Sequence, residues 1–187
     1  MSDILVLTGS PRPDGNSRML ADSFVDGAVN AGLDVKVFHT AGMDIAPCLG
    51  CEYCRSHEGQ CIQIDDMQLI MPHLHEAKVV VFATPLYFYG MSAQLKLAVD
   101  RMYALLGRKP AVDSCVLLAS YADEDGKAPE ALIAHYKAFT GYSRWKNLGI
   151  VTAGCVHAER EIAGHPALDE ARRLGESMRS VFGQPGI

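Results

Sequence analysis

Short apolar runs alternate with amphipathic stretches along most of the chain. Continuous apolar runs at 4–8, 77–83 and 114–120 predict strands. The β-branched run at 77–83 predicts a central strand that is buried on both faces. The alternating residues of 33–38 predict a strand with one exposed face, and a fifth strand is predicted at 148–153. Because stretches of helical periodicity separate these strands, the pattern indicates βαβ units with right-handed crossovers and a parallel sheet.

The stretches between and after the strands predict five helices. Asp65 or Asp66 can cap the second helix, and Ser92 can cap the third. Pro166 lies near the first turn of the last helix, and Gly183 is predicted to end that helix. The predicted helices span about 17–31, 65–76, 92–106, 129–140 and 167–182.

These elements predict one α/β domain over residues 1–187, with a cysteine-rich loop inserted at about 46–62. A doubly wound, five-stranded parallel sheet would be the middle of three layers. Because only five strands are available, we predict the strand order 2-1-3-4-5 and not the longer dinucleotide-binding order. The hydrophobic content of 49% is enough for one substantial core.

The charge and hydropathy of the chain disfavour two classes of partner. A formal net charge of −5 gives no overall electrostatic reason to bind nucleic acid or an anionic membrane. No segment approaches the roughly 20 apolar residues that a membrane-spanning helix needs. The first residues lack the basic start and long apolar stretch of a secretory signal. We therefore expect a cytoplasmic protein with no nucleic-acid and no membrane partner.

The loop after the first strand has the composition of an anion-binding site. Residues 9–17 are Gly-Ser-Pro-Arg-Pro-Asp-Gly-Asn-Ser and lead into the first helix, whose free N–H groups and dipole favour a phosphate. The loop lacks the Gly-Lys-Ser/Thr of nucleotide triphosphatases and the three-glycine dinucleotide spacing. An alternative is that Asn16 and Ser17 only cap the helix. The predicted phosphate-binding side chains are Ser10, Arg12, Asn16 and Ser17.

Four of the six cysteines lie within one short segment. The first three have the spacing of a bacterial ferredoxin, but the last gap is six residues and is followed by Ile62 where ferredoxins have proline. Zinc and free thiols or disulfides are alternatives to a cluster. Cys115 and Cys155, in or near predicted strands, are expected to be small buried side chains. The predicted ligands of one [4Fe-4S] cluster are Cys48, Cys51, Cys54 and Cys61.

Together these motifs resemble the NADPH-dependent FMN reductases and iron-sulfur flavoproteins. The resemblance rests on the loop at 9–17 and on Pro-Cys-x-Gly-Cys-x-x-Cys at 47–54. It extends to Asp-Asp-Met at 65–67, to Thr-Pro-Leu-Tyr at 84–87, and to Leu95-Lys96 and Asp100-Arg101. The resemblance implies a flavodoxin-like fold and FMN as the cofactor. It also supports the assignment of the four clustered cysteines to a [4Fe-4S] cluster. Family members are commonly dimers or tetramers, so a homodimer or homotetramer is expected.

The resemblance places the flavin ring against the loop after the third strand. That loop follows the switch point between strands one and three, where ligands of open α/β sheets bind. An alternative for its aromatic residues is ordinary core packing or a subunit contact. Ser120, at the end of the fourth strand, is expected to approach the other edge of the flavin. The predicted ring contacts are Pro85, Leu86, Tyr87, Phe88, Tyr89 and Gly90.

Other polar and aromatic residues are expected to have structural roles. Asp100 and Arg101 are adjacent on one helix, so they cannot face each other and should reach different neighbours. Both are expected to be structural or interfacial, and Trp145 is expected to pack in the core.

The function that these motifs predict is FMN-dependent electron transfer. NAD(P)H or a protein donor would reduce the flavin, and the acceptor would be a flavin, a quinone, an oxygen species or a ferredoxin. No acid–base catalytic residue is implied. One alternative is a non-catalytic flavin and iron-sulfur electron carrier. The other is a metal-binding or redox-sensing protein that depends on the cysteines alone.

Overall fold

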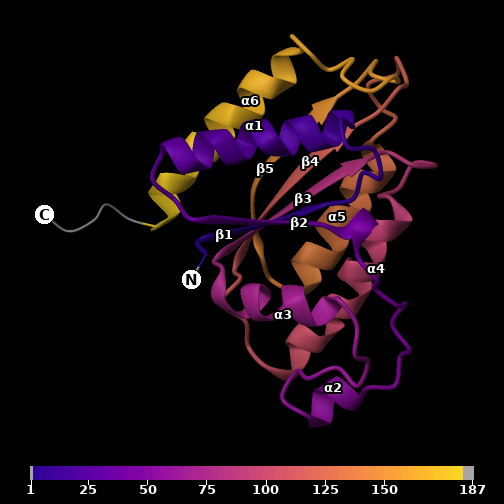
Figure 1. The fold of residues 1–187 in the computed structure, drawn as a ribbon, viewed down its shortest axis with the longest axis vertical. Coiled ribbons are helices and arrows are strands. Elements are labelled where there is room, and N and C mark those ends of the chain that lie inside the picture. The colour runs from indigo at the N-terminus through magenta and orange to yellow at the C-terminus, as the bar shows by residue number, and fades with distance from the viewer. Residues whose placement is uncertain (1, 183–187) are drawn as a thin grey trace, which may run out of the picture.

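Five parallel strands form one sheet in the predicted order β2-β1-β3-β4-β5 (Figure 1). The structure is a computed structural model, and it describes residues 2–182. Three predicted strands are shifted or extended by up to two residues, and the predicted helix end at Gly183 lies outside the described residues. The strands are β1 (Ile4–Thr8), β2 (Val35–His39), β3 (Val79–Pro85), β4 (Ser114–Ser120) and β5 (Lys146–Ala153).

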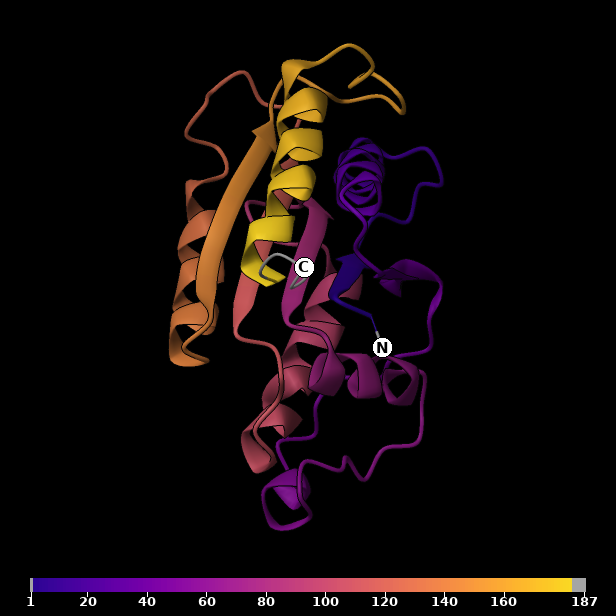
Figure 2. The ribbon, with the colours of Figure 1, turned by 90° about the vertical axis from the view of Figure 1, so that its left-hand side faces the viewer.

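Helices cover both faces of the sheet (Figures 1 and 2). On one face lie α1 (Asn16–Asn30) and α6 (Pro166–Ser177), followed by the 3₁₀ turn η3 (Met178–Phe182). On the other face lie α3 (Met67–Glu76), α4 (Ala93–Arg101) with η2 (Met102–Gly107), and α5 (Glu130–Tyr142). Between β2 and α3 the chain forms η1 (Thr40–Gly42) and the short α2 (Tyr53–Ser56).

Because both faces are covered, alternate residues of one strand enter two separate cores. Leu5 and Leu7 pack with the α3, α4 and α5 side, whereas Ile4 and Val6 pack with the α1 and α6 side. All four side chains are completely buried. Two buried faces explain why the central strands appear in the sequence as continuous apolar runs.

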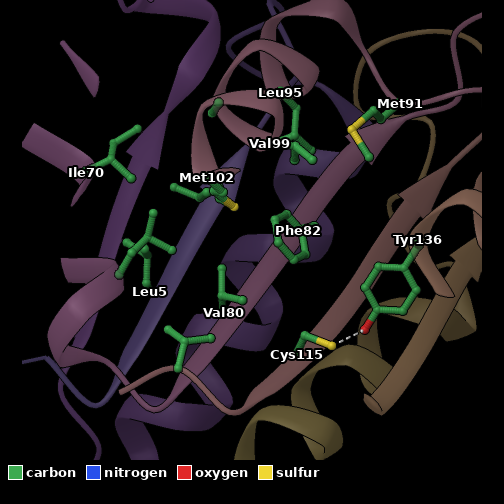
Figure 3. Packing of buried hydrophobic residues seen from close by; sticks show 14 of the residues in the cluster. Leu5, Ile70, Val80, Phe82, Met91, Leu95, Val99, Met102, Cys115 and Tyr136 are labelled. Carbon is green, nitrogen blue, oxygen red and sulfur yellow. Dashed lines mark hydrogen bonds between the residues drawn. The ribbon is translucent and has the colours of Figure 1, made fainter. Parts of the chain in front are cut away.

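Aromatic side chains pack around Phe82 in the core on the α4 and α5 side of the sheet, and Figure 3 shows Phe82 and Tyr136 among them. The Phe82 ring centroid lies 5.4 Å from that of Phe139 and 6.5 Å from that of Trp145, which confirms the packing role of the tryptophan. Cys115 is buried as predicted, and its Sγ lies 3.1 Å from the Tyr136 hydroxyl. The prediction for Cys155 was wrong, because β5 ends at Ala153 and Cys155 follows in an exposed left-handed turn with φ 58°.

Helices α1 and α6 approach each other through two glycines. A Cβ atom added at Gly27 would lie 2.1 Å from the Arg172 carbonyl oxygen. A Cβ atom added at Gly175 would lie 2.1 Å from the Phe24 carbonyl oxygen. The absent side chains therefore permit this close backbone contact.

The Gly27→Ala substitution is expected to lower the free energy of unfolding by about 1–3 kcal/mol, because the new methyl group forces the two helices apart. Alanine is otherwise the better helix former by about 1 kcal/mol. Gly141 on α5 is the matched control, since a Cβ atom there meets nothing within 4 Å. Urea denaturation should show Gly141→Ala as neutral or stabilising, and equal destabilisation by both variants would contradict the proposed contact.

None of the helices in residues 2–182 combines the length and apolar character needed to cross a membrane.

Candidate functional site

Four loops at the carboxyl ends of the strands enclose a cavity of about 240 Å³. It lies where the loops after β1 and β3 meet, at the topological switch point of the sheet. The predicted site residues that line it are Ser10, Arg12, Asn16, Ser17, Pro85, Leu86, Tyr87 and Ser120. The structure adds to these Gly15, Tyr121, Ala122, Val156 and His157.

Ser17 is the most informative residue of the cavity. It is 1% exposed, and its Oγ has no hydrogen-bond partner among the described residues. A buried hydroxyl without a partner is costly, so this atom fits a ligand oxygen that is bound at the start of α1. Ser10 differs, because its Oγ already accepts a hydrogen bond from the Arg12 N–H at 3.2 Å.

The alternative role of Asn16 and Ser17 as simple helix caps does not hold. The N-cap residue of α1 is Gly15, and among the described residues no side chain makes a capping hydrogen bond to the helix. A Cβ atom at Gly15 would lie 2.2 Å from Ser10 Oγ, so the glycine also keeps the loop tightly folded. The Ser17 hydroxyl is therefore available to a ligand.

The loop between β5 and α6 is held against the predicted phosphate-binding loop (residues 9–17) by two predicted phosphate ligands. Asn16 Nδ2 donates to the Ala158 carbonyl at 2.8 Å, and Asn16 Oδ1 accepts from the Ile162 N–H at 3.2 Å. An Arg12 Nη donates to the His157 carbonyl at 3.0 Å. These side chains position the loop in this structure, a role that sequence analysis missed because the partners are more than 140 residues away.

The Glu161 carboxylate stabilises the turn of this loop. It accepts hydrogen bonds from the N–H groups of Ala158 and His157, and these bonds lower the pKa of Glu161. An ion pair between Arg160 and Asp14, with N···O 2.9 Å, adds a second exposed contact between the two loops.

The Asn16→Ala substitution is expected to destabilise the fold by about 1–3 kcal/mol, because it leaves the buried Ile162 N–H without its acceptor. Hydrogen exchange of the Ile162 amide should accelerate more than exchange of amides in β3. An unchanged Ile162 exchange rate would show that Asn16 does not hold the loop.

The loop after β3 forms a tight turn that exposes its aromatic residues. Tyr87 and Gly90 exchange two backbone hydrogen bonds, at 2.9 and 3.0 Å, and Phe88 and Tyr89 between them have φ 48° and 66°. Phe88 is fully exposed and Tyr89 is 57% exposed. Of the predicted ring contacts, Phe88, Tyr89 and Gly90 lie outside the described lining of the cavity, so their contact with a flavin stays a prediction.

Ser92 links this aromatic loop to the phosphate-binding loop. Its Oγ donates to the Gly9 carbonyl at 2.7 Å, and its N–H donates to Thr84 Oγ1 at 3.0 Å. Ser92 is also the predicted N-cap of α4, where its Oγ accepts from the Leu95 N–H. Two of the four loops that form the cavity are therefore held in one arrangement.

The base of the cysteine loop is closed by a buried ion pair. Arg101, whose side chain is 1% exposed, donates through both Nη atoms to the Asp65 carboxylate. Arg101 also donates to the Ala46 carbonyl at 2.9 Å, and Asp65 accepts from the Ala46 N–H at 3.0 Å. Asp100 instead pairs with Lys96, which confirms that Asp100 and Arg101 reach different neighbours.

The cysteine side chains of this loop lie near one another, but they are not arranged as a metal site among the described residues. Cys48 and Cys51 are exposed, whereas Cys54 and Cys61 are half-buried. Burial raises the pKa of Cys54, and the nearby thiol groups of Cys61, Cys48 and Cys51 raise that pKa further. Thiolates are suitable donors for iron, but within residues 2–182 no three His, Cys, Asp or Glu side chains are placed to hold a metal. The fit of a cluster is thus supported by donor chemistry and not by geometry.

The model of the NADPH-dependent FMN reductase family matches residues 2–153. The chain belongs to this family. The match includes the phosphate-binding loop, the cysteine loop and the aromatic loop, and it supports FMN as the flavin of this member.

Curated relatives of this FMN reductase family member include several that are named iron-sulfur flavoproteins. One, from Methanocaldococcus jannaschii, is 36% identical over 98 residues, which are 52% of this chain and 50% of the relative. Another, from Archaeoglobus fulgidus, is 37% identical over 103 residues, which are 55% and 52% of the two chains. The chain thus spans about half the length of the curated relatives it matches.

Solved structures support the fold of the family member. An NAD(P)H:quinone oxidoreductase from Methanothermobacter marburgensis has a TM-score of 0.75 at 21% identity, with coverage of 95% of this chain and 96% of that one. A Trp repressor binding protein from Bacillus subtilis has a TM-score of 0.68 at 23% identity, with coverage of 91% and 96%. At these identities the similarity concerns the fold alone, and it agrees with the predicted flavodoxin-like architecture.

Proposed function

We propose that this protein is an FMN-dependent oxidoreductase that passes electrons from NAD(P)H or a protein donor to an acceptor. The observation that carries the proposal is the buried hydroxyl of Ser17, which has no hydrogen-bond partner among the described residues and lies at the switch-point cavity of an FMN reductase family member. Bound FMN would supply the redox chemistry, and the protein would supply binding and orientation.

The residues of the cavity suit the anionic end of FMN. Ser17 Oγ can donate to a phosphate oxygen, and the N-terminus of α1 favours its negative charge. Arg12 keeps guanidinium N–H groups beyond the one that it donates to His157. The cavity of about 240 Å³ is small for a whole cofactor. We therefore assign the cavity to the phosphate end and the ring to its mouth, beside Tyr87.

Flavin binding and turnover test the proposal in two steps. Purified protein should be yellow, or should bind added FMN saturably with quenching of flavin fluorescence. Steady-state oxidation of NADPH and NADH with a quinone acceptor then separates an enzyme from a non-catalytic carrier, which would bind FMN but not turn over. Protein that neither contains nor binds FMN would refute the proposed function.

We also propose that Cys48, Cys51, Cys54 and Cys61 hold a [4Fe-4S] cluster. Support comes from their ferredoxin-like spacing, from the softness of four thiolates and from the names of the relatives. The cluster would require the loop to bring the four side chains together. Iron and sulfide analysis of anaerobically purified protein is the direct test. Zinc without sulfide, or wild-type iron content in a Cys51→Ser and Cys54→Ser double variant, would refute the cluster.

A homodimer or homotetramer is part of the same proposal. The exposed aromatic turn at Phe88 and Tyr89 offers a contact for a second copy beside the flavin cavity. Light scattering coupled to size-exclusion chromatography tests it, and a monomer at micromolar concentration would contradict it.

A further inference from the structure

A second cavity, of about 530 Å³, lies between the cysteine loop, α3, the end of α4 and Arg108, which follows η2. Among the described residues it shares no lining residue with the flavin cavity. Of the four clustered cysteines only Cys61 lines it, so the cavity is beside the proposed cluster and not at its centre. Its volume falls within the range of small-molecule sites.

Two buried nitrogen atoms of this cavity lack hydrogen-bond partners within the described part of the chain. They are Arg101 Nε and His75 Nδ1. The Nη atoms of Arg101 donate to Asp65 and Ala46, and the Cys61 side chain lies beside the guanidinium. Nε is the guanidinium N–H group that has no hydrogen-bond partner among the described residues. Burial, and then the charge of Arg108, lower the pKa of His75, which favours a neutral imidazole with one N–H. A ligand with acceptor oxygens would satisfy both nitrogens.

The charges around the cavity favour a neutral ligand. The Arg101 guanidinium is already neutralised by the bidentate Asp65 carboxylate. The exposed Arg108 at the rim is opposed by the exposed Glu58 and Glu76. This arrangement provides no excess positive charge for an anion and no buried carboxylate pair for a cation.

One wall of the cavity is apolar and suits a planar body. Met67, Met71 and Pro72 line it, and thioethers make favourable contacts with aromatic rings. Donors that lack partners among the described residues, together with the apolar lining side chains, match a molecule with a polar oxygen and an apolar ring.

We propose that this cavity binds a neutral aromatic carbonyl compound. The carbonyl oxygen accepts hydrogen bonds from Arg101 Nε and from the Nδ1–H tautomer of His75, and the ring packs on Met67 and Met71. The site is distinct from the flavin cavity, and its occupation does not depend on flavin.

Three probes of similar size test the ligand class by calorimetric titration into FMN-treated protein. Acetophenone should bind saturably with one site per chain. Ethylbenzene, which lacks the oxygen, and benzoate, which carries a charge, should each bind at least about fivefold more weakly. Absence of saturable acetophenone binding, or equal binding of the three probes, would overturn the proposal.

A matched pair of histidine variants on α3 tests the position. His75→Phe should weaken acetophenone binding about 5- to 10-fold, because one hydrogen bond is lost. His73→Phe is the control, since His73 does not line the cavity and instead contacts Ser2 and Phe38. Equal affinities of the two variants would place the ligand elsewhere.

Arg101→Lys provides a second test of the donor, with circular dichroism to confirm folding. Loss of acetophenone affinity in folded Arg101→Lys supports the assignment, and wild-type affinity would refute it. If that variant does not fold, His75→Phe decides the question alone. FMN affinity measured on the same samples keeps the outcome separate from the flavin proposal.

Discussion

Asp65→Asn is expected to lower the free energy of unfolding by about 3–5 kcal/mol, which is the usual cost of removing one partner from a buried ion pair. The carboxylate accepts hydrogen bonds from both Nη atoms of Arg101 and from the N–H groups of Ala46 and Met67. Without the negative charge, the Arg101 guanidinium remains buried and uncompensated. Chemical denaturation monitored by circular dichroism measures the loss.

The matched control is the exposed ion pair of Lys96 and Asp100 on α4, the helix that also carries Arg101. Asp100 contacts Lys96 with side chains that are 47% and 39% exposed, so solvent screens their attraction. Asp100→Asn should therefore change stability by less than about 1 kcal/mol. Comparable losses from the two variants would contradict a special role for the buried pair at the base of the cysteine loop.

The buried pair also predicts an acid dependence of stability. Burial alone would raise the pKa of Asp65, but hydrogen bonds from Arg101, Ala46 and Met67 outweigh it and lower that pKa below its ordinary value of 3.8. The stabilisation is thus complete above the unfolded-state pKa and is lost as pH falls through the lower folded-state pKa. The stability difference between wild type and Asp65→Asn should shrink as pH falls below about 4. A pH-independent difference would exclude ionised Asp65 as its source.

Ser17→Ala is expected to weaken FMN binding about 10- to 100-fold, because a hydrogen bond to a charged phosphate contributes about 1.5–3 kcal/mol. The same change should leave the FMN-free protein as stable as wild type or about 1 kcal/mol more stable, since it removes a buried hydroxyl that has no partner among the described residues. Fluorescence titration with FMN and denaturation of the flavin-free protein measure the two effects.

Ser23, which also lies on α1, provides a control for which the opposite effects on stability and FMN affinity are expected. Its Oγ donates to the Leu168 carbonyl at 2.7 Å. Ser23→Ala should therefore cost about 1 kcal/mol of stability and leave FMN affinity unchanged. A loss of stability in Ser17→Ala, with unchanged FMN affinity, would instead make Ser17 a structural residue.

Sequence patterns predicted the elements of the fold well, because the signals for them are local. Both faces of β1, β3 and β4 are buried, which produces apolar runs, and the N-cap role of Ser92 depends on a residue three positions away. The strand order followed from the number of strands and the right-handedness of crossovers. Cys155 shows the limit of this reasoning, because its exposure depends on a turn two residues beyond the end of β5.

By itself, the sequence determined the sheet, its order and the two loops that carry the candidate chemistry, because periodicity and motif spacing are properties of neighbouring residues. Only the tertiary structure decided how individual polar atoms are used. Asn16 is bound to the 158–162 loop while the hydroxyl of Ser17 remains available, and Arg101 closes the cysteine loop through Asp65. Such assignments depend on partners distant in the sequence, because each buried donor must find an acceptor wherever packing places one.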